Sequence, residues 1–304
     1  MAKEKKNDQV SSVRRAKHGG ILTTVFVLLG VFWISPIAVV LLNSFKRKAY
    51  IFKYPFSVST KSLFGDGVDA WKAGIEKAMC GMLNYTNALK KTDFFSCFGV
   101  SLFITVGSVI AIIICCSMCA WYLTRVHNKM TKTLYTLCLF SMVVPFQMVM
   151  FTLSKFANIL HLNTPWGIII VYLGFGAGLA VFMFSGFIKG ISLEIEEASM
   201  IDGCSPLQTF FRVVFPILKP TTVTIAILEA MWVWNDYLLP SLVLNVNKYR
   251  TIPIAVQYLK QSHGQLDWGA MMAVLVLAIV PIIIFYIACQ KYIIEGVVAG
   301  AVKG

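Results

Sequence analysis

A concentration of polar and aromatic side chains lies within a long apolar stretch near residue 230. Glu229, Trp232, Asn235 and Asp236 fall within about two turns of a helix. On a continuous helix, Glu229, Trp232 and Asp236 stand at positions i, i+3 and i+7, so they share one face. Aromatic rings can stack on the C–H faces of a sugar while carboxylates accept hydrogen bonds from its hydroxyls, and an ionisable residue inside a span marks a functional site. These residues form a candidate solute pathway.

Two simpler interpretations of this segment remain open. The tryptophans and Asp236 can form an aromatic belt at the membrane interface, with Glu229 paired to a neighbouring helix. Asn235 and Asp236 can also serve only as helix caps. Gln147, which follows a proline in another apolar stretch, is a further polar group expected to face the interior. We include it in the candidate pathway.

A second chemically distinct stretch, residues 192–220, carries four acids between two long apolar runs. A polar segment of this kind cannot lie in hydrocarbon, so it must dock on something at the membrane surface. Ser192 is placed to cap a short helix, and Gly203 permits a break because glycine adopts left-handed backbone conformations without steric cost. Ser205 is placed to cap a second helix, with Gln208 completing a capping box. This second helix is expected to bring an apolar set to one face: Phe210, Phe211 and Val214.

The same stretch resembles the EAA motif of ABC importer permeases. The motif reads roughly E-A-A, three residues, G, nine residues, I-x-L-P, with Ser199 here in place of the second alanine and mild departures at Val213 and Phe215. The resemblance implies a cytoplasmic coupling helix that seats in a groove on a separate ATP-hydrolysing subunit. An ordinary helical hairpin between two spans is the alternative. The residues placed in ATPase coupling by the resemblance are Glu197, Ala198, Ser199, Asp202, Gly203 and Pro216.

Two further segments resemble the carbohydrate-uptake branch of these permeases. Residues 234–240, WNDYLLP, are similar to its W-N-[DE]-[FY]-x-x-P segment, and the glycine-rich C-terminus resembles that of the smaller permease subunit of maltose-type transporters. The resemblance implies half of a pathway for a sugar, expected to be an oligosaccharide. The implied partners are a second permease subunit in a heterodimer, an ABC ATPase dimer and an extracellular solute-binding protein. ATP and Mg²⁺ would be bound by the ATPase, and no cofactor by this chain.

Composition places the chain in a membrane. Of its 304 residues, 58% are hydrophobic and only 13% are charged, whereas soluble domains have about 25% charged residues. Six apolar runs reach the length of roughly 20 residues that a membrane-spanning helix needs. The sequence predicts an all-α polytopic membrane protein with six transmembrane helices and a cytoplasmic coupling helix. The net charge of +13 is assigned to loops facing anionic lipid, not to a nucleic-acid partner.

The predicted organisation follows the apolar runs. A basic cytoplasmic tail, 1–20, precedes a first transmembrane helix at 21–43 and an extracytoplasmic loop at 44–93. A permease core at 94–292 holds five transmembrane helices and the EAA loop, and 293–304 form a cytoplasmic tail. Within the core, the third span is expected at 133–153, broken by Pro145, and the fifth at 221–243.

No catalytic or metal-binding constellation is found. The four histidines are scattered, and the chain has no GxxxxGK[ST] phosphate loop. Cys116-x-x-Cys119 lies inside a span without a second pair, so the cysteines are expected to act as small hydrophobes. Gly174, Gly176 and Gly178 are interpreted as small residues that allow close helix packing. The chain is therefore expected not to be an enzyme, and we assign it no catalytic residues and no metal-binding residues.

Charge alone leaves the topology nearly undecided, because the basic residues divide almost equally between the two sides. The N-terminal tail and the loop at 125–132 favour a multi-pass protein of the bacterial plasma (inner) membrane with both termini in the cytoplasm. Two alternatives remain: a permease for another small solute, and a secondary transporter that works alone. The latter predicts internal repeats and intramembrane charges paired within one chain, and no repeat is found.

Overall fold

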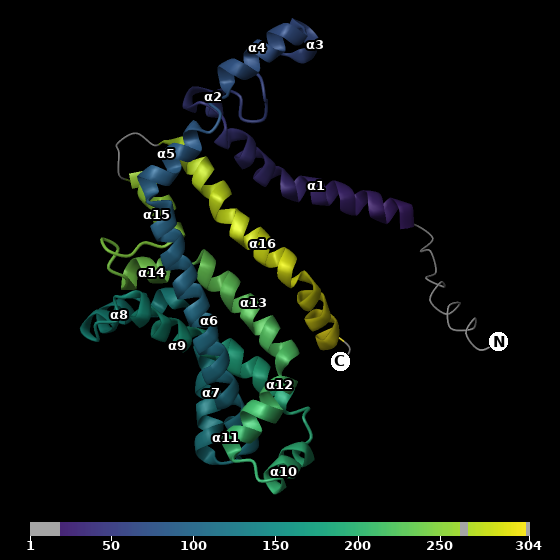
Figure 1. The fold of residues 1–304 in the computed structure, drawn as a ribbon, viewed down its shortest axis with the longest axis vertical. Helices are drawn as coiled ribbons and strands as arrows, with labels where there is room; N and C mark the ends of the chain where they lie inside the picture. Colours follow the sequence, from purple (N-terminus) through teal and green to yellow (C-terminus); the bar gives the residue numbers. More distant parts are fainter. Residues whose placement is uncertain (1–18, 262–266, 302–304) are drawn as a thin grey trace, which may run out of the picture. The chain divides into compact units, whose positions relative to one another are not determined.

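The computed structural model describes residues 19–261 and 267–301. These ranges are helical apart from connecting segments and one isolated β-bridge between Lys46 and Met79. The all-α class is thus confirmed for the described residues. The chain divides into two compact units, Met1–Asn84 and Tyr85–Gly304 (Figure 1).

Four of the described helices are long and apolar enough to cross a membrane by themselves. Two further pairs of helices meet the same test only when each bent pair is taken together, which brings the number of candidate spans to six. The prediction of a six-helix membrane protein agrees with this higher number. One bent pair, Lys129–Val143 with Phe146–Ile159, covers the predicted third span, whereas the other joins Pro206–Ile217 of the polar segment 192–220 to Lys219–Asn235 at 77°.

The first unit begins with the long helix α1 (Gly19–Ser44), within which the predicted span 21–43 lies. Its apolar side chains are exposed within the unit, which suits a surface surrounded by lipid. Three short helices follow inside the predicted loop 44–93: α2 (Lys48–Lys53), α3 (Leu63–Asp66) and α4 (Val68–Ala78).

A buried lysine holds the turn that follows α1. Lys46 is fully buried, and its Nζ donates to Asn43 Oδ1 (2.9 Å) and to the carbonyls of Tyr54 (2.7 Å) and Pro55 (3.3 Å). Asn84 donates in turn to the Lys46 carbonyl (2.8 Å). Burial lowers the pKa of Lys46. This lysine is therefore a structural residue and not the surface charge that a topology count assumes.

The second unit contains the remaining helices, and α5 joins the two units along the chain. Their bounds are α5 (Leu83–Thr92), α6 (Phe94–Arg125), α7 (Lys129–Val143), α8 (Phe146–Ile159), α9 (Pro165–Ile188), α10 (Leu193–Ile201), α11 (Pro206–Thr209), a π-helical turn (Phe210–Val214), α12 (Phe215–Ile217), α13 (Lys219–Asn235), α14 (Leu238–Val243), α15 (Ile252–Gln261) and α16 (Trp268–Ala301).

The core of the second unit forms along the pair α6 and α9, which make the most extensive helix–helix contact, and α7 and α13 pack against this pair. Glycines allow the close approach. A Cβ atom on Gly176 would lie 2.6 Å from Ile112 Cδ1 of α6, and one on Gly178 would lie 2.8 Å from the Cys138 carbonyl of α7. The packing interpretation of the glycine cluster is confirmed at these two positions but not at Gly174, where a Cβ would meet nothing within 4 Å.

Two predicted spans are not continuous helices. The predicted span 133–153 is replaced by α7 and α8, which meet at a bend of 108° next to Pro145. Proline lacks the N–H that would continue the α7 hydrogen bonds, and it occupies the position just before α8. The predicted span 221–243 is interrupted after Asn235, where Asp236 has an extended backbone.

The structure describes the two predicted terminal tails to different extents. Residues 1–18 and 302–304 are outside them, so the basic N-terminal tail carries no structural description beyond the start of α1. At the other end, α16 continues to Ala301. Most of the range 293–304 predicted as a tail is therefore a continuation of the last helix.

Candidate functional site: a polar helical hairpin and a buried acid

The polar segment 192–220 folds into a hairpin of short helices. Ser192 occupies the position before α10, but its side chain makes no capping hydrogen bond, contrary to the prediction. Gly203 has φ of +87°, the left-handed conformation expected of it. Ser205 and Gln208 form the predicted capping box: Gln208 Oε1 accepts from the Ser205 N–H (2.8 Å), and Ser205 Oγ accepts from the Gln208 N–H (3.4 Å). We call residues 192–220 the coupling hairpin.

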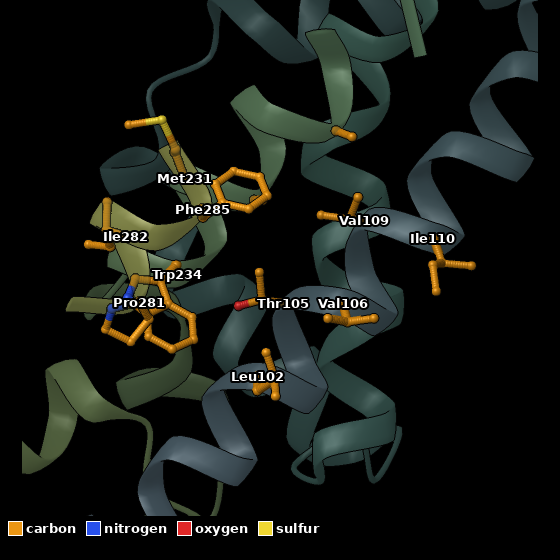
Figure 2. Close-up of a pocket in the computed structure, with 12 residues that line it drawn as sticks. Leu102, Thr105, Val106, Val109, Ile110, Met231, Trp234, Pro281, Ile282 and Phe285 are labelled. Carbon is orange, nitrogen blue, oxygen red and sulfur yellow. The ribbon is translucent and has the colours of Figure 1, made fainter. Parts of the chain in front are cut away.

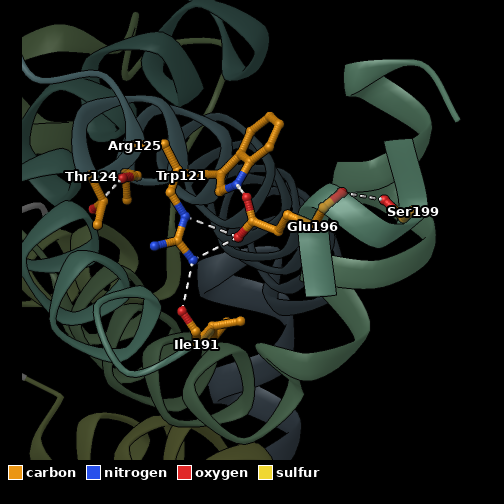
Figure 3. Close-up of polar contacts among 7 residues, drawn as sticks. Trp121, Thr124, Arg125, Ile191, Glu196 and Ser199 are labelled. Carbon is orange, nitrogen blue, oxygen red and sulfur yellow. Dashed lines mark hydrogen bonds and ion pairs between the residues drawn. The ribbon is translucent and has the colours of Figure 1, made fainter. Parts of the chain in front are cut away.

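A buried acid that sequence reasoning did not select fixes the coupling hairpin to α6. Glu196 is 2% exposed, and its carboxylate accepts hydrogen bonds from Trp121 Nε1 (2.9 Å) and from Arg125 Nη2 (2.7 Å) and Nε (3.0 Å) (Figure 3). Arg125 Nη2 also donates to the carbonyl of Ile191 (3.0 Å). The guanidinium therefore connects the end of α6 both to Ile191, just before the coupling hairpin, and to α10 within the hairpin.

The two arms of the coupling hairpin are joined by a hydroxyl pair. Ser199 Oγ lies 2.9 Å from both the Glu196 carbonyl and Thr209 Oγ1, and all three groups are buried. Beyond Thr209 the helix widens into the π-helical turn, in which Phe210 is buried and stacks against Trp121 at a centroid distance of 5.4 Å. Phe211 is 47% exposed, so the prediction that it shares the buried face of Phe210 and Val214 is wrong.

The structure divides the residues predicted for ATPase coupling between two faces. Ser199 is buried as described, whereas the other five are exposed on the outside of the coupling hairpin: Glu197, Ala198, Asp202, Gly203 and Pro216. Large apolar side chains are exposed beside them, among which Ile201 is 85% and Leu207 is 59% exposed. Acids and apolar groups thus share a surface at the tip of the hairpin, as a docking surface requires.

The acid in the membrane span lies in a groove between α7, α9 and α13. Glu229 is 2% exposed, and its Oε2 has no hydrogen-bond partner among the described residues. The groove has a volume of about 260 Å³ and is also lined by Trp232, Phe175 and Ser141. A buried carboxylate oxygen with unused acceptor capacity is costly unless a ligand or partner supplies a donor. Because Glu229 and Trp232 line the same groove, they share one face of α13, as predicted.

Asp236 does not continue that face. Because α13 ends at Asn235, Asp236 turns away from the helix and its Oδ2 accepts from the Tyr172 hydroxyl (3.0 Å). Its Oδ1 accepts from the N–H groups of Leu238 (2.9 Å) and Leu239 (3.4 Å) at the start of α14. The prediction of a shared helical face fails at this residue, and the capping alternative describes its contacts. Tyr172, which also stands edge-on to Trp232 at 5.4 Å, was not anticipated.

The remaining predicted pathway residues, Gln147 and Asn235, do not line the groove at Glu229. Gln147 is exposed near the start of α8, so the prediction that it faces the interior is wrong for this chain. Asn235 is exposed, and its amide donates to the Met231 carbonyl (2.7 Å). Trp234 lines a separate cavity of about 250 Å³ between α6, α13 and α16 (Figure 2). Thr105 supplies the only hydroxyl among the side chains around that cavity, so it suits a hydroxylated solute poorly.

The residues that the sequence did not reveal share one property: their partners are distant along the chain. Glu196 and Arg125 are separated by 71 residues, and Tyr172 and Asp236 by 64. The available signals were local ones, namely an acid directly before the EAA-like motif and an arginine at the end of a span. Neither signal identifies its partner. No group of three or more His, Cys, Asp or Glu side chains able to hold a metal occurs among the described residues.

The second unit is a bundle of helices long and apolar enough to cross a membrane, and it carries a polar hairpin, so its architecture is that of a polytopic membrane protein. The chain belongs to the family described as the binding-protein-dependent transport system inner membrane component, whose model matches residues 104–298. It is therefore a transmembrane permease component of an ABC importer, located in the inner membrane, and not the catalytic subunit of that importer.

Similar proteins match nearly the whole chain. The probable starch degradation products transport system permease protein AmyC of Thermoanaerobacterium thermosulfurigenes is 38% identical, over 93% of this chain and 96% of the relative. The melibiose/raffinose/stachyose import permease protein MelC of Bacillus subtilis is 30% identical, over 95% and 99%. A bacterial ABC transporter structure, involved in import of the acidic polysaccharide alginate, has a TM-score of 0.70 at 22% identity and covers 92% of this chain and 98% of that one; it supports the fold.

Proposed function

We propose that this permease forms half of the pathway of a sugar importer and is driven by a separate ATPase through the coupling hairpin. The observation that carries the coupling is the arrangement of two adjacent acids. Glu196 is buried against Arg125, which makes the hairpin rigid with α6, while Glu197 is exposed beside apolar side chains and is free to meet another subunit. A movement of the docked hairpin would then be transmitted directly to a membrane-spanning helix.

The proposed assembly contains a second, related permease, an ABC ATPase dimer that binds ATP and Mg²⁺, and an extracellular solute-binding protein. Both termini and the coupling hairpin face the cytoplasm, because the ATPase is a cytoplasmic subunit in this arrangement. ATP must bind the two states of the assembly with different affinity for its binding to shift them. The cargo is a sugar, expected to be an oligosaccharide, since the relatives' names refer to starch degradation products and to melibiose, raffinose and stachyose.

Affinity purification of the tagged chain from its native membrane in mild detergent tests the assembly. We expect an ATPase and a second permease to co-purify, and we expect Glu197→Ala to reduce ATPase recovery. The matched control is Glu76→Ala, which removes an exposed acid outside the hairpin and should leave recovery unchanged. A chain that purifies without an ATPase from intact native membranes, or equal ATPase recovery for both variants, would contradict the proposal.

We propose that Glu229 meets the sugar as it passes through the membrane. Its free Oε2 can accept a hydrogen bond from a hydroxyl group, and Trp232 and Phe175 offer aromatic faces in the same groove. In the reconstituted importer, Glu229→Gln should lower the uptake rate about tenfold or more, while Glu229→Asp retains more uptake because it keeps the carboxylate. We expect this loss of uptake because a hydrogen bond to a charged group contributes more free energy than one to a neutral group.

Thermal stability separates this role from simple packing. If Glu229 contacts the sugar, Glu229→Gln should change uptake kinetics with little change in Tm. A large fall in Tm with normal uptake per folded transporter would show that the residue only stabilises helix packing.

A further inference from the structure

A basic cavity that the transport mechanism does not use lies where α6, α7 and α9 end or begin. It has a volume of about 580 Å³ and is lined by the end of α6, the first turns of α7 and the end of α9. Thr124 of its wall is adjacent to Arg125, which binds Glu196 of the coupling hairpin. The cavity therefore opens at the same end of the second unit as the hairpin.

The charge around this cavity has one sign. Lys129, Lys132 and Lys189 line it together with His127, and its lining includes no aspartate or glutamate. Within the described part of the chain, none of the three lysines lies within ion-pair distance of an acid. Lys189 stands over the ring of Tyr135 with its Nζ 5.7 Å from the centroid. Three exposed ammonium groups around one hollow attract an anion.

A buried hydroxyl in the wall of the cavity has unused hydrogen-bonding capacity. Ser185 is 1% exposed, and its Oγ has no hydrogen-bond partner among the described residues. A helical serine commonly bonds the carbonyl three or four residues before it, as Ser117 does on α6. The two threonine hydroxyls of the lining, those of Thr124 and Thr131, are already bonded to backbone carbonyls. Ser185 is therefore a donor without an acceptor in the wall of a positively charged cavity.

We infer that this cavity binds the phosphate-bearing headgroup of an anionic membrane lipid. Two candidate spans, α6 and α9, end at its edge at Arg125 and Ile188, so the cavity lies at the depth of lipid headgroups. Basic pockets at such a depth between membrane helices bind anionic headgroups. Phe182 is half exposed one turn before Ser185 on α9, where an acyl chain below the headgroup would contact it.

The size of the cavity favours a headgroup over a free phosphate ion. A volume of about 580 Å³ lies within the range of about 300–1,000 Å³ that is typical of small-molecule binding pockets. A single phosphate would leave most of that space to solvent. A phosphoglycerol headgroup with its ester linkages would occupy more of it and could place one phosphate oxygen near Ser185 and others near the lysines.

Lipid binding to the purified full-length chain tests the assignment without any transport assay. The chain is placed in nanodiscs of phosphatidylcholine containing a minor fraction of phosphatidylglycerol, and the lipids retained after mild extraction are counted by native mass spectrometry. We expect the triple variant Lys129→Gln, Lys132→Gln, Lys189→Gln to reduce the preference for phosphatidylglycerol about tenfold or more. The matched control carries the same change at three exposed lysines elsewhere: Lys72, Lys77 and Lys90. It should keep the preference.

Further arms of the experiment decide between the possible ligands. Ser185→Ala, which suits a helix, should reduce the preference severalfold, and it serves as the test if the triple variant does not fold. Inorganic phosphate at 10 mM should not displace the lipid if the headgroup is the ligand. Equal retention by the wild type and both cavity variants, or full displacement by phosphate, would overturn the assignment. So would a loss of ATPase binding in the cavity variants without any change in lipid binding, because the cavity would then be a protein contact.

Discussion

At the scale of single residues, two neighbouring glutamates on α10 have opposite environments. Glu196 is buried and accepts hydrogen bonds from both Arg125 and Trp121, whereas Glu197 is exposed. Successive helical residues are rotated by about 100°, so one of the two can face the protein while the other faces solvent. The motif acid is thereby left available to a partner, and the acid before it anchors the helix that presents it.

This difference predicts that two alanine substitutions change the thermal stability by very different amounts. Glu196→Ala leaves the Arg125 guanidinium partly buried without its carboxylate, which costs about 3 kcal/mol or more and should lower Tm by about 6–12 °C. Glu197→Ala should change Tm by less than about 2 °C. Thermal unfolding of the purified chain in detergent measures both. A smaller fall in Tm for Glu196→Ala than for Glu197→Ala would contradict the anchoring role.

At the scale of helices, glycines act through two distinct physical effects. Gly203 lies in open space, where a Cβ would meet nothing within 4 Å, but its φ of +87° is strained for other residues. Gly178 has ordinary helical geometry, but a Cβ on it would lie 2.6 Å from Met142 Cγ and 2.7 Å from Ser141 Oγ of α7. The first glycine is required by the backbone, and the second by the neighbouring helix.

The effect of a substitution at Gly203 should therefore depend on how well the new residue tolerates a left-handed backbone conformation. Gly203→Val should distort the break between α10 and α11 at a cost of about 1–2 kcal/mol, and it should uncouple ATP hydrolysis from uptake while membrane insertion is normal. Gly203→Asn, which tolerates the left-handed region, should retain most of the coupling. The ratio of uptake to ATP hydrolysis in proteoliposomes measures the effect. Normal coupling in the valine variant would remove the hairpin break from the mechanism.

At Gly178 the effect of a substitution should depend instead on the space between α9 and α7. Gly178→Ala is expected to push α7 away from α9 and to destabilise the chain by about 1–3 kcal/mol. Gly174→Ala is the control on the same helix, because a methyl group there meets nothing within 4 Å. It should be neutral or stabilise the helix by up to about 1 kcal/mol. Tm values in detergent distinguish the two, and equal losses would refute close packing at Gly178.

At the scale of the whole molecule, burial falls from the centre of the second unit to its edge. Half of the most apolar window of α9 is buried, against a third of that of α6 and 11% of that of α16. The apolar surfaces left over must face lipid or another subunit, since contiguous apolar surface of this extent marks a membrane or interaction site. A permease that forms only half of a pathway is expected to leave such surface for its partner.

If the chain forms only half of a pathway, it should not transport sugar by itself. Liposomes containing only this chain should take up sugar no faster than empty liposomes, with or without a proton or sodium gradient. Liposomes containing the complete assembly should show uptake that requires ATP. Radiolabelled sugar uptake measures both, and gradient-driven uptake by the chain alone would favour the secondary transporter.

The sequence by itself determined the features that depend on residues near one another along the chain. The apolar runs predicted the membrane helices, Gly203 predicted the break in the hairpin, and Ser205 with Gln208 predicted a capping box that the structure contains. Each of these depends on local backbone conformation or on contacts three residues apart. The bend at Pro145 was also predicted as a break, but its angle of 108° was not.

The tertiary structure alone decided which polar groups are paired. It paired Glu196 with Arg125 across 71 residues, bonded Asp236 to the Tyr172 hydroxyl across 64 residues, and buried Lys46 among backbone carbonyls. No local rule could assign the partners of Glu196 and Asp236, because the packing of helices that are distant along the chain brings them together. The burial of Glu229 with a free carboxylate oxygen likewise follows from the packing of α7, α9 and α13 and not from its position in the span.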